Sequence, residues 1–549
     1  MNGHGHEVEL ILGLVLLVAG VVWVANRLRV PYPVLLVVVG LALSFVPGLP
    51  RAELKPEHVF VLFLPPILFH AALLTSWRDF RANLRPIGTL AVGLVLATTA
   101  LVAAVAHWLI PGMGWGPAFV LGAIVSPPDA VAATAVMHRL RVPRRIVTIL
   151  EGESLVNDAT ALVAYRFAVA ATVAVAGGFS LAAASGRFVV LGAGGVVVGY
   201  VAGMLVGWLR PRMRDSGVEQ LLILMTPYVA YLSAEWAGVS GVLAVVTCGI
   251  YIARRVANTT SARVRLQAYA TWETVIFVLN GLVFILIGLQ LTDVRARLSD
   301  ASSLGRLVWY GVAISLVAIV VRMVYVFIAT ALSARVPKRF RLPDPPPPPS
   351  QVFMVAWTAM RGVVSLAAAL ALPETLADRV TPFPHRDLIL FITFGVILVT
   401  LVVQGFSLPL LIRWLKLDTF HDEHADEEYT ARYLTALAAI ERLDALVGPD
   451  GGNGAGAGTS GSAAAVQRLR ATYDERLAYF SRLINPPEPG AATDLTALPP
   501  RDTSDAVLRE TLAAERRMLF QLRDNGVIGD DVLRRVEQEL DLEESKLGG

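Results

Sequence analysis

The sequence of 549 residues has little charge and almost no cysteine. Charged residues make up 17% of the chain and hydrophobic ones 55%, with a mean hydropathy of +0.60, whereas soluble domains carry roughly 25% charged residues. This shortage of charge excludes an ordinary soluble protein and indicates a membrane protein. The single cysteine, Cys248, excludes an intrachain disulfide, and its place in an apolar run predicts a buried apolar role.

The charges that are present do not form a basic surface. The formal net charge is +3, and the arginines stand at the ends of apolar runs, which argues against nucleic acid as a partner. The glycine-rich run 189–207 is not a phosphate loop, because it has the length of a membrane span and no Lys-Ser or Lys-Thr follows it. Its glycines, three or four residues apart, predict close helix packing instead. We expect no cofactor and no enzyme activity.

The apolar runs have the length of membrane spans. Runs of about 20 residues cross a ~30 Å hydrocarbon core at 1.5 Å per residue, and they recur until about residue 415. Thirteen candidate spans are centred near residues 17, 40, 67, 98, 126, 163, 198, 228, 247, 280, 320, 362 and 400. The first run lacks the basic flank and cleavage site of a signal peptide. The sequence predicts an all-α membrane domain over residues 1–416, in the lipid bilayer of the plasma membrane.

Basic residues are concentrated in alternate loops and predict an orientation. The basic loops hold Arg27 and Arg29; Arg78, Arg81 and Arg85; Arg139, Arg141, Arg144 and Arg145; Arg210, Arg212 and Arg214; Arg254, Arg255, Arg263 and Arg265; and Arg335, Lys338, Arg339 and Arg341. The intervening loops are poor in basic residues. By the positive-inside rule the N-terminus is outside and the C-terminus is cytoplasmic, which requires an odd number of spans.

From residue 417 the composition changes to charged, helix-forming sequence such as DEEYTARYLTALAAIERLDAL. Two stretches interrupt it, GPDGGNGAGAGTSGS and NPPEPGAATDLTALPP, and both are typical of flexible linkers. The sequence therefore predicts a cytoplasmic helical tail over residues 417–549, with a role in regulation or assembly.

Residues 151–160, EGESLVNDAT, place polar groups between two apolar stretches. An ionisable group inside a span is costly, so each is a functional-site hypothesis. Glu153 and Asn157 are four residues apart, as are Ser154 and Asp158, so on a helix the two pairs cover neighbouring faces. The stretch predicts a polar pocket.

Two spans contain signals for an interrupted helix. Residues 126–129, Ser-Pro-Pro-Asp, stand at the middle of the fifth span, where two prolines remove backbone donors. Arg361 and Gly362 stand at the centre of the twelfth span. Irregular backbone at membrane depth is tolerated where it lines a cavity or is buried in protein. One interrupted span in each half is typical of inverted-repeat transporters with a midplane site.

The intramembrane polar residues divide between two interpretations. Asp158 has a hydroxyl and an amide beside it, and such oxygens coordinate hard cations, so Asp158 is the predicted site for a hard cation. For Glu153 and Arg361 we favour a structural ion pair over a functional one. Two more intramembrane charges have no assigned partner and are expected to be structural: Arg166 and Arg322.

Six motifs occur in order along the membrane part: VPYPVLLVVVG at 30–40, LPPILFHAAL at 64–73, VSPPDAVAATAV at 125–136, GESLVNDATALV at 152–163, FVLNGLVFILIGLQL at 277–291 and MRGVVSLAAALALP at 360–373. The GESLVND run followed by MRG in a later span is the most specific feature. On these motifs the chain resembles the monovalent cation/proton antiporter family, in particular bacterial NhaP-type antiporters related to animal sodium/proton exchangers.

That resemblance implies a transporter that exchanges Na⁺, or K⁺ or Li⁺, for H⁺ and serves pH homeostasis as a homodimer. By the resemblance, Asp158 matches the ion-binding aspartate and Asn157 the asparagine that usually accompanies electroneutral exchange. Asp129 matches the aspartate at the unwound crossing and Ser154 a ligand hydroxyl. The same resemblance assigns a stabilising ion pair of the transport core to Glu153 and Arg361.

The chain departs from the family at two positions. His70 stands where relatives often have an acidic residue, and Pro128 where many have a hydroxyl residue before the aspartate. His70 is therefore a candidate for pH response, with a buried histidine satisfied by its neighbours as the preferred alternative. Pro128 removes a side-chain ligand and is expected to shift cation preference.

The mechanism that we expect is competition at one carboxylate. Asp158 binds a proton or a cation, never both, and only the occupied site crosses the membrane. Because Asp129 could approach Asp158, an intramembrane aspartyl protease is one alternative. An ion channel and a K⁺/H⁺ antiporter of the same fold are the others.

Overall fold

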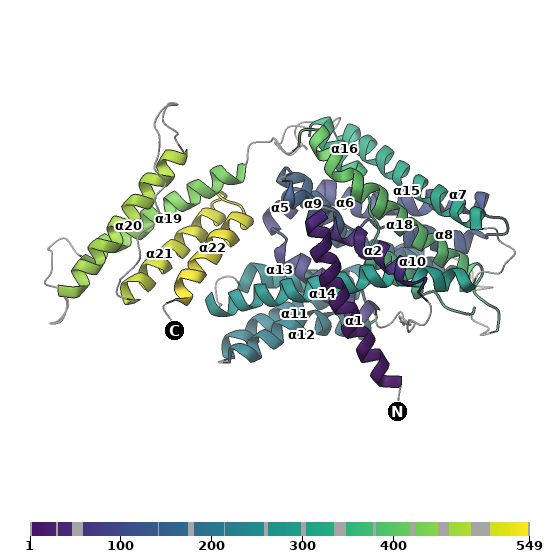
Figure 1. Ribbon diagram of the computed structural model, residues 1–549, viewed down its shortest axis with the longest axis horizontal. Helices are drawn as coiled ribbons and strands as arrows, with labels where there is room; N and C mark the ends of the chain where they lie inside the picture. The colour runs from purple at the N-terminus through teal and green to yellow at the C-terminus, as the bar shows by residue number, and fades with distance from the viewer. Residues whose placement is uncertain are drawn as a thin grey trace. The chain divides into compact units, whose positions relative to one another are not determined.

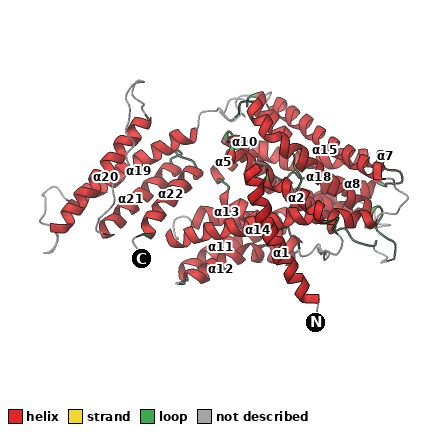
Figure 2. Cartoon of the chain, viewed as in Figure 1, coloured by secondary structure: helices red, strands yellow, loops and turns green. Residues whose placement is uncertain are grey.

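The computed structural model describes residues 3–28, 31–46, 59–140, 142–173, 181–213, 215–256, 262–297, 304–333, 347–376, 380–417, 423–447, 460–484 and 505–546. Within these ranges the regular structure is helical (Figure 2), with one isolated bridge between Thr375 and Pro382. Several of the basic loop residues that predict the orientation lie outside the described residues: Arg29, Arg141, Arg214, Arg335, Lys338, Arg339 and Arg341.

The chain divides into two compact units. Unit 1 contains Met1–Thr259 and Thr271–Phe420, and unit 2 contains Thr260–Ala270 and His421–Gly549. The sequence placed residues 260–270 in the membrane domain, whereas the structure places them with the tail. Helix α14 (Ala262–Arg297) therefore begins in unit 2 and continues into unit 1.

Helices of very different length build unit 1 (Figure 1). Besides α14, they are α1 (Gly3–Leu28), α2 (Tyr32–Leu43), α4 (Leu64–Leu74), α5 (Trp77–Ala82), α6 (Leu84–Gly88), α7 (Val95–Leu109), α8 (Trp115–Val125), α9 (Val131–Arg139), α10 (Arg144–Val173), α11 (Leu181–Leu209), α12 (Ser216–Trp236), α13 (Gly241–Val256), α15 (Leu304–Ser333), α16 (Pro349–Trp357), α17 (Val363–Leu370) and α18 (Arg386–Trp414). Two π-helical turns, η1 (Val59–Phe63) and η2 (Thr89–Leu94), lead into α4 and α7.

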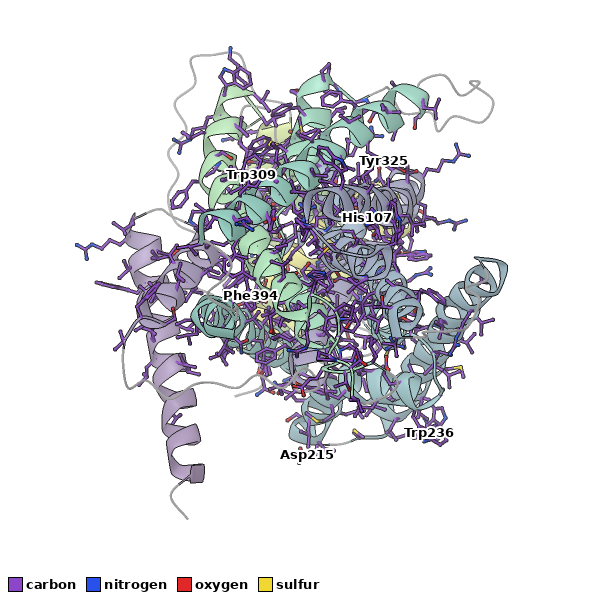
Figure 3. All side chains as sticks on the ribbon, turned by 90° about the vertical axis from the view of Figure 1, so that its right-hand side faces the viewer. His107, Asp215, Trp236, Trp309, Tyr325 and Phe394 are labelled. Atoms are coloured by element: carbon purple, nitrogen blue, oxygen red, sulfur yellow. The ribbon has the colours of Figure 1, made fainter. Side chains whose placement is uncertain are left out.

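Five helical stretches among the described residues are long and apolar enough to cross a membrane: Leu84–Leu109, Val189–Arg212, Val264–Gln290, Leu304–Ser333 and Arg386–Trp414. Large apolar side chains are also exposed on the outer surface of unit 1. Trp236, at the end of α12, is 92% exposed and lies at the rim of the bundle in Figure 3, while Phe394 of α18 is 1% exposed and lies among the helices. Exposed large aromatic side chains of this kind suit a lipid environment.

The helices of unit 1 pack in two groups around two hydrophobic clusters. One group contains α7, α8, α15 and α18, and α15 runs beside α18 in Figure 1. The other contains α4, α11, α12 and α13, where Cys248 is fully buried as predicted. Helix α10 contributes side chains to both clusters. The helix that carries Asp158 therefore lies at the boundary between the two groups.

Helices α11 and α13 approach each other at glycines. A side chain at Gly195 would meet the carbonyl oxygen of Ser240, and one at Gly199 would meet the carbonyl oxygen of Ala244. The close packing predicted from the glycine spacing is confirmed.

Both predicted helix interruptions are present. Helix α8 ends at Val125 and α9 begins at Val131, because Pro127 and Pro128 cannot donate to a regular helix. Helix α16 ends at Trp357 and α17 begins at Val363. Each break leaves about five residues of irregular backbone between two short helices.

Unit 2 is a helical bundle with its own apolar core. It contains α19 (Glu423–Val447), α20 (Ser460–Ile484), α21 (Asp505–Asp524) and α22 (Asp530–Ser545), together with the first residues of α14. Inside this unit, Arg265 of α14 donates to Asp541 of α22, with 2.8 Å between Nε and Oδ2, and its Nε lies 3.5 Å from a Glu537 oxygen. These ion pairs explain why the start of α14 belongs to the tail.

Candidate functional site

The two helix interruptions meet and are held together by backbone. The amide of Asp129 donates to the carbonyl oxygen of Met360 at 2.7 Å. The Asp129 carboxylate accepts from the amide of Val131 at 2.8 Å and also hydrogen-bonds the amide of Val363. One carboxylate therefore lies at the N-terminal ends of both α9 and α17, where it compensates the positive end of each helix.

Gly362 allows this approach. A Cβ atom at this position would overlap the Asp129 carboxylate. The glycine that the sequence suggested as a helix breaker thus has a second role, since it leaves room for the aspartate.

Arg361 compensates the opposite helix ends. Its guanidinium Nε donates to the carbonyl oxygen of Val125 at 3.0 Å, and Nη1 donates to the carbonyl oxygen of Ala359. Val125 is the last residue of α8, where unsatisfied carbonyls carry partial negative charge. Arg361 therefore compensates the negative helix end at the crossing, while Asp129 compensates the positive ends.

Helix α10 is tied to the first interruption by two side chains. Asn157 Nδ2 donates to the carbonyl oxygen of Pro128 at 2.9 Å, and the amide of Ala130 donates to Ser154 Oγ at 3.3 Å. Asn157 is fully buried and does not line the cavity described below. Its amide positions the broken backbone beside Asp158.

The predicted ion pair between Glu153 and Arg361 is replaced by another. The Glu153 carboxylate accepts hydrogen bonds from both Nη atoms of Arg322, on α15, with 2.7 Å between Nη2 and Oε2. Both side chains are 1% exposed. Arg322 also donates to the Val355 carbonyl at 3.1 Å. The prediction was wrong because sequence spacing cannot show which of two intramembrane arginines faces the glutamate.

A cavity of about 240 Å³ opens beside the crossing. Asp158, Asp129 and Ser154 line it. Asp158 makes no hydrogen bond or ion pair with any residue that the structure describes, although its side chain is buried. Its carboxylate is left for a ligand.

His70 lines the same cavity from α4, next to the ring of Trp272 at 6.0 Å between centroids. Within the described ranges its imidazole makes no hydrogen bond. The preferred interpretation, a histidine satisfied by its neighbours, therefore finds no hydrogen-bond support in these residues.

Two cavity residues were missed by the sequence reasoning: Asn280 of α14 and Ser365 of α17. Both are neutral and stand alone in apolar runs, where most such residues only pack against other helices. Proximity to Asp158 in the fold is the signal that identifies them.

A second cavity, of about 390 Å³, lies further along α10 and is lined by Leu162, Tyr165 and Arg166. Arg166 pairs there with Glu235 of α12 at 2.9 Å. The lining of the first cavity ends at Asp158 and that of the second begins at Leu162, so about one helical turn of α10 separates the two.

Comparison with known proteins gives a consistent result. The sodium/hydrogen exchanger transmembrane family matches residues 13–414. An uncharacterised Na⁺/H⁺ exchanger from Mycobacterium tuberculosis is 36% identical over 100% of this chain and 99% of its own length. A sodium, potassium, lithium and rubidium/H⁺ antiporter from Bacillus pumilus is 39% identical over 70% of this chain and 58% of its own length.

A solved structure shares the fold. The sodium proton antiporter MjNhaP1 from Methanocaldococcus jannaschii superimposes with a TM-score of 0.61 at 18% identity, over 76% of this chain and 100% of that one. At this identity the likeness concerns the fold of the membrane part alone.

Proposed function

Because the chain belongs to the sodium/hydrogen exchanger family, we propose that it binds one monovalent cation and one proton in turn at Asp158 and exchanges them across the plasma membrane. The family consists of membrane-embedded, multi-pass cation/proton antiporters, so the chain is a transporter and not an enzyme. Membership removes the aspartyl protease hypothesis. Na⁺ is the first candidate ion, with K⁺ as the alternative and Li⁺ as a further substrate.

The observation that carries this proposal is the unpartnered carboxylate. Asp158 is 7% exposed, lines a cavity and has no protein partner among the described residues. A bare carboxylate in such a place is strongly disfavoured, so a proton or a cation must neutralise it. The hydroxyl of Ser154 and the carboxylate of Asp129, which line the same cavity, are proposed as further ligands.

The charges around the crossing support a ratio of one to one. Glu153 is paired with Arg322, and the Asp129 carboxylate accepts backbone amides, whereas Asp158 has no partner among the described residues. One proton or one monovalent cation neutralises Asp158, and the two loaded forms then carry the same charge. Exchange is therefore proposed to be electroneutral.

The two cavities support alternating access. Water reaches Asp158 from the first cavity, while the Arg166–Glu235 pair lies in the second, about one turn further along α10. We propose that the group of helices carrying the crossing shifts against the group around α13, so that Asp158 meets one cavity at a time. Only a neutral, loaded site makes this shift.

The remaining features are proposed from the sequence and the family. A helix or a helix break lies at each of the thirteen predicted span centres, which supports thirteen spans built as inverted repeats. The N-terminus is proposed to lie outside and the C-terminus in the cytoplasm, and the functional unit to be a homodimer. His70 is the candidate for pH response, because it lines the cavity that contains Asp158.

Proton flux in sealed proteoliposomes tests the proposal. With a pH-sensitive dye inside, addition of Na⁺, K⁺ or Li⁺ should change the internal pH in the unaltered protein and not in Asp158→Asn. Asp387→Asn, which changes an exposed aspartate at the start of α18, is the matched control and should transport normally. Flux that persists in Asp158→Asn would place the binding site elsewhere.

A further inference from the structure

Two buried side-chain oxygens that line the first cavity have no hydrogen-bond partner. The side-chain oxygen Oδ1 of Asn280 and the hydroxyl Oγ of Ser365 make no hydrogen bond, and the residues are 4% and 1% exposed. Both residues line the cavity that contains Asp158. Two buried oxygens without partners therefore lie where a ligand is expected.

Several other buried hydroxyls in unit 1 donate to the backbone carbonyl oxygen four residues earlier. Ser315 donates to the carbonyl oxygen of Gly311, and Thr358 donates to that of Met354, each on its own helix. A buried polar group left unpaired costs about 1–3 kcal/mol. Ser365 makes no such bond. Its hydroxyl remains available to the cavity.

The chemistry of the two groups suits an alkali cation. An amide oxygen and a hydroxyl oxygen are hard, neutral ligands of the kind that replace water around Na⁺ or K⁺. Neutral ligands also leave the charge of the site unchanged. They therefore stabilise the cation-bound site relative to the empty site without repelling the competing proton. Asp158 alone supplies two carboxylate oxygens, which is too few to replace a hydration shell.

We propose that Asn280 Oδ1 and Ser365 Oγ are ligands of the transported cation and decide which alkali ion the site prefers. This inference rests on the function proposed above. The carboxylate then supplies the charge for which cation and proton compete, while the two neutral oxygens act on the cation alone.

The two ligands come from different parts of unit 1. Ser365 lies on α17, whose N-terminal end is capped by Asp129. Asn280 lies on α14, which packs against α1 and α2, because Gly281 contacts Val18 and Gly288 contacts the backbone of Gly40. If the crossing shifts against α14, Ser365 moves with Asp158 and Asn280 does not. The ligand set is then complete in this conformation and loses Asn280 in the other, which would release the cation.

Cation-induced thermal stabilisation of the purified full-length protein tests the proposal. The unfolding temperature is measured over a titration of NaCl, KCl or LiCl against choline chloride at constant ionic strength, for the unaltered protein, Asn280→Leu and Ser365→Ala. Because each variant removes an unpaired buried oxygen, we expect its unfolding temperature in choline to be unchanged or higher. We expect the cation concentration for half-maximal stabilisation to rise about tenfold, by different factors for the three ions.

The matched control is Thr393→Val. Thr393 lies on α18, is fully buried and has an unpaired hydroxyl, but it does not line the cavity. This variant should keep the cation dependence of the unaltered protein. Should Asn280→Leu fail to fold, Asn280→Ser shortens the side chain and gives the same test.

Asp158→Asn separates the two possible failures. Stabilisation that is lost in Asp158→Asn but kept in Asn280→Leu and Ser365→Ala would overturn the ligand assignment and leave the proposed function standing. No cation-induced stabilisation of the unaltered protein would contradict both. An equal loss in Thr393→Val would show that any buried hydroxyl has the same effect, and would also overturn the assignment.

Discussion

Arg322 satisfies the glutamate that stands one turn before Asp158. Its fork of nitrogens matches both oxygens of Glu153, and both side chains are shielded from solvent. Arg361 instead donates to the carbonyl oxygens at the end of α8 and in the second interruption. The two arginines are therefore not interchangeable, although each is a lone cation in an apolar run.

A double-mutant cycle distinguishes the two arginines. Removing one partner of a buried pair costs about 3–5 kcal/mol, so we expect Glu153→Gln and Arg322→Gln each to lower the unfolding temperature strongly. The double variant should be much less destabilised than the sum of the two, because the remaining charge is removed as well. Glu153→Gln combined with Arg361→Gln should be nearly additive. Strong coupling with Arg361 instead would contradict the pairing.

Gly362 gives a steric prediction at the crossing. A methyl group there overlaps the Asp129 carboxylate, so we expect Gly362→Ala to displace Asp129 and to reduce cation/proton exchange by at least tenfold in proteoliposomes. Gly88→Ala is the control, because a Cβ at Gly88 meets nothing within 4 Å, and it should retain full exchange. Normal exchange in Gly362→Ala would show that the position of Asp129 is not needed.

Single residues were predictable where they violate the rule for membrane spans. Asp129, Asp158 and Arg361 are charges in apolar runs, so the sequence alone identifies them as important. The partner of Glu153 was not predictable, because it depends on which faces of α10 and α15 meet. Asn280 was not predictable either, since a neutral amide in an apolar run breaks no rule.

At the scale of elements, the chain order of breaks and helices was readable from the sequence. Two prolines in the fifth span and Arg361-Gly362 in the twelfth predict interrupted helices, and the structure contains both. The hydrogen bond that joins them, from the Asp129 amide to the Met360 carbonyl oxygen, was not predictable. Backbone contacts between distant segments do not require particular side chains, so the sequence does not indicate them. The position of α10 between two hydrophobic clusters is also a property of the assembled helices.

Cross-linking of α10 to α12 tests the proposed movement between helix groups. Arg166 and Glu235 pair in the second cavity, so a short bismaleimide joining Arg166→Cys to Glu235→Cys should stop exchange. The native Cys248 is fully buried and remains unmodified. Gly192→Cys with Leu243→Cys joins α11 to α13, where a Cβ at 192 lies 3.6 Å from Leu243. This control link lies within one helix group and should leave exchange intact. Full exchange through the first link would contradict the movement.

At the scale of the whole molecule, one helix belongs to both units. Helix α14 begins in unit 2, where Arg265 is paired with Asp541, and fifteen residues after Arg265 it carries Asn280 in unit 1. The sequence predicted a separate helical tail but not this connection, because the partner of Arg265 lies 276 residues away.

Neutralising Asp541 tests the role of this connection. Asp541 is 1% exposed and accepts hydrogen bonds from both Arg265 and Arg516. Asp541→Asn therefore removes the negative charge of the carboxylate that the two guanidiniums share. We expect amide hydrogen exchange of α22 in the full-length protein to accelerate by at least tenfold, and the cation concentration for half-maximal transport to change. Glu510→Gln removes an exposed partner of Arg442 and should change neither. An unaltered rate of amide hydrogen exchange in α22 would contradict the importance of the buried pairs.

Proton release on cation binding tests the central claim most directly. Purified protein in detergent and a weakly buffered solution with a pH indicator is mixed with NaCl near the pH at which Asp158 is half-protonated. Competition at one carboxylate predicts about half a proton released per protein at that pH, rising toward one at lower pH and falling at higher pH, and no release from Asp158→Asn. Cation binding without proton release at any pH, or the same release from Asp158→Asn, would contradict exchange at this site.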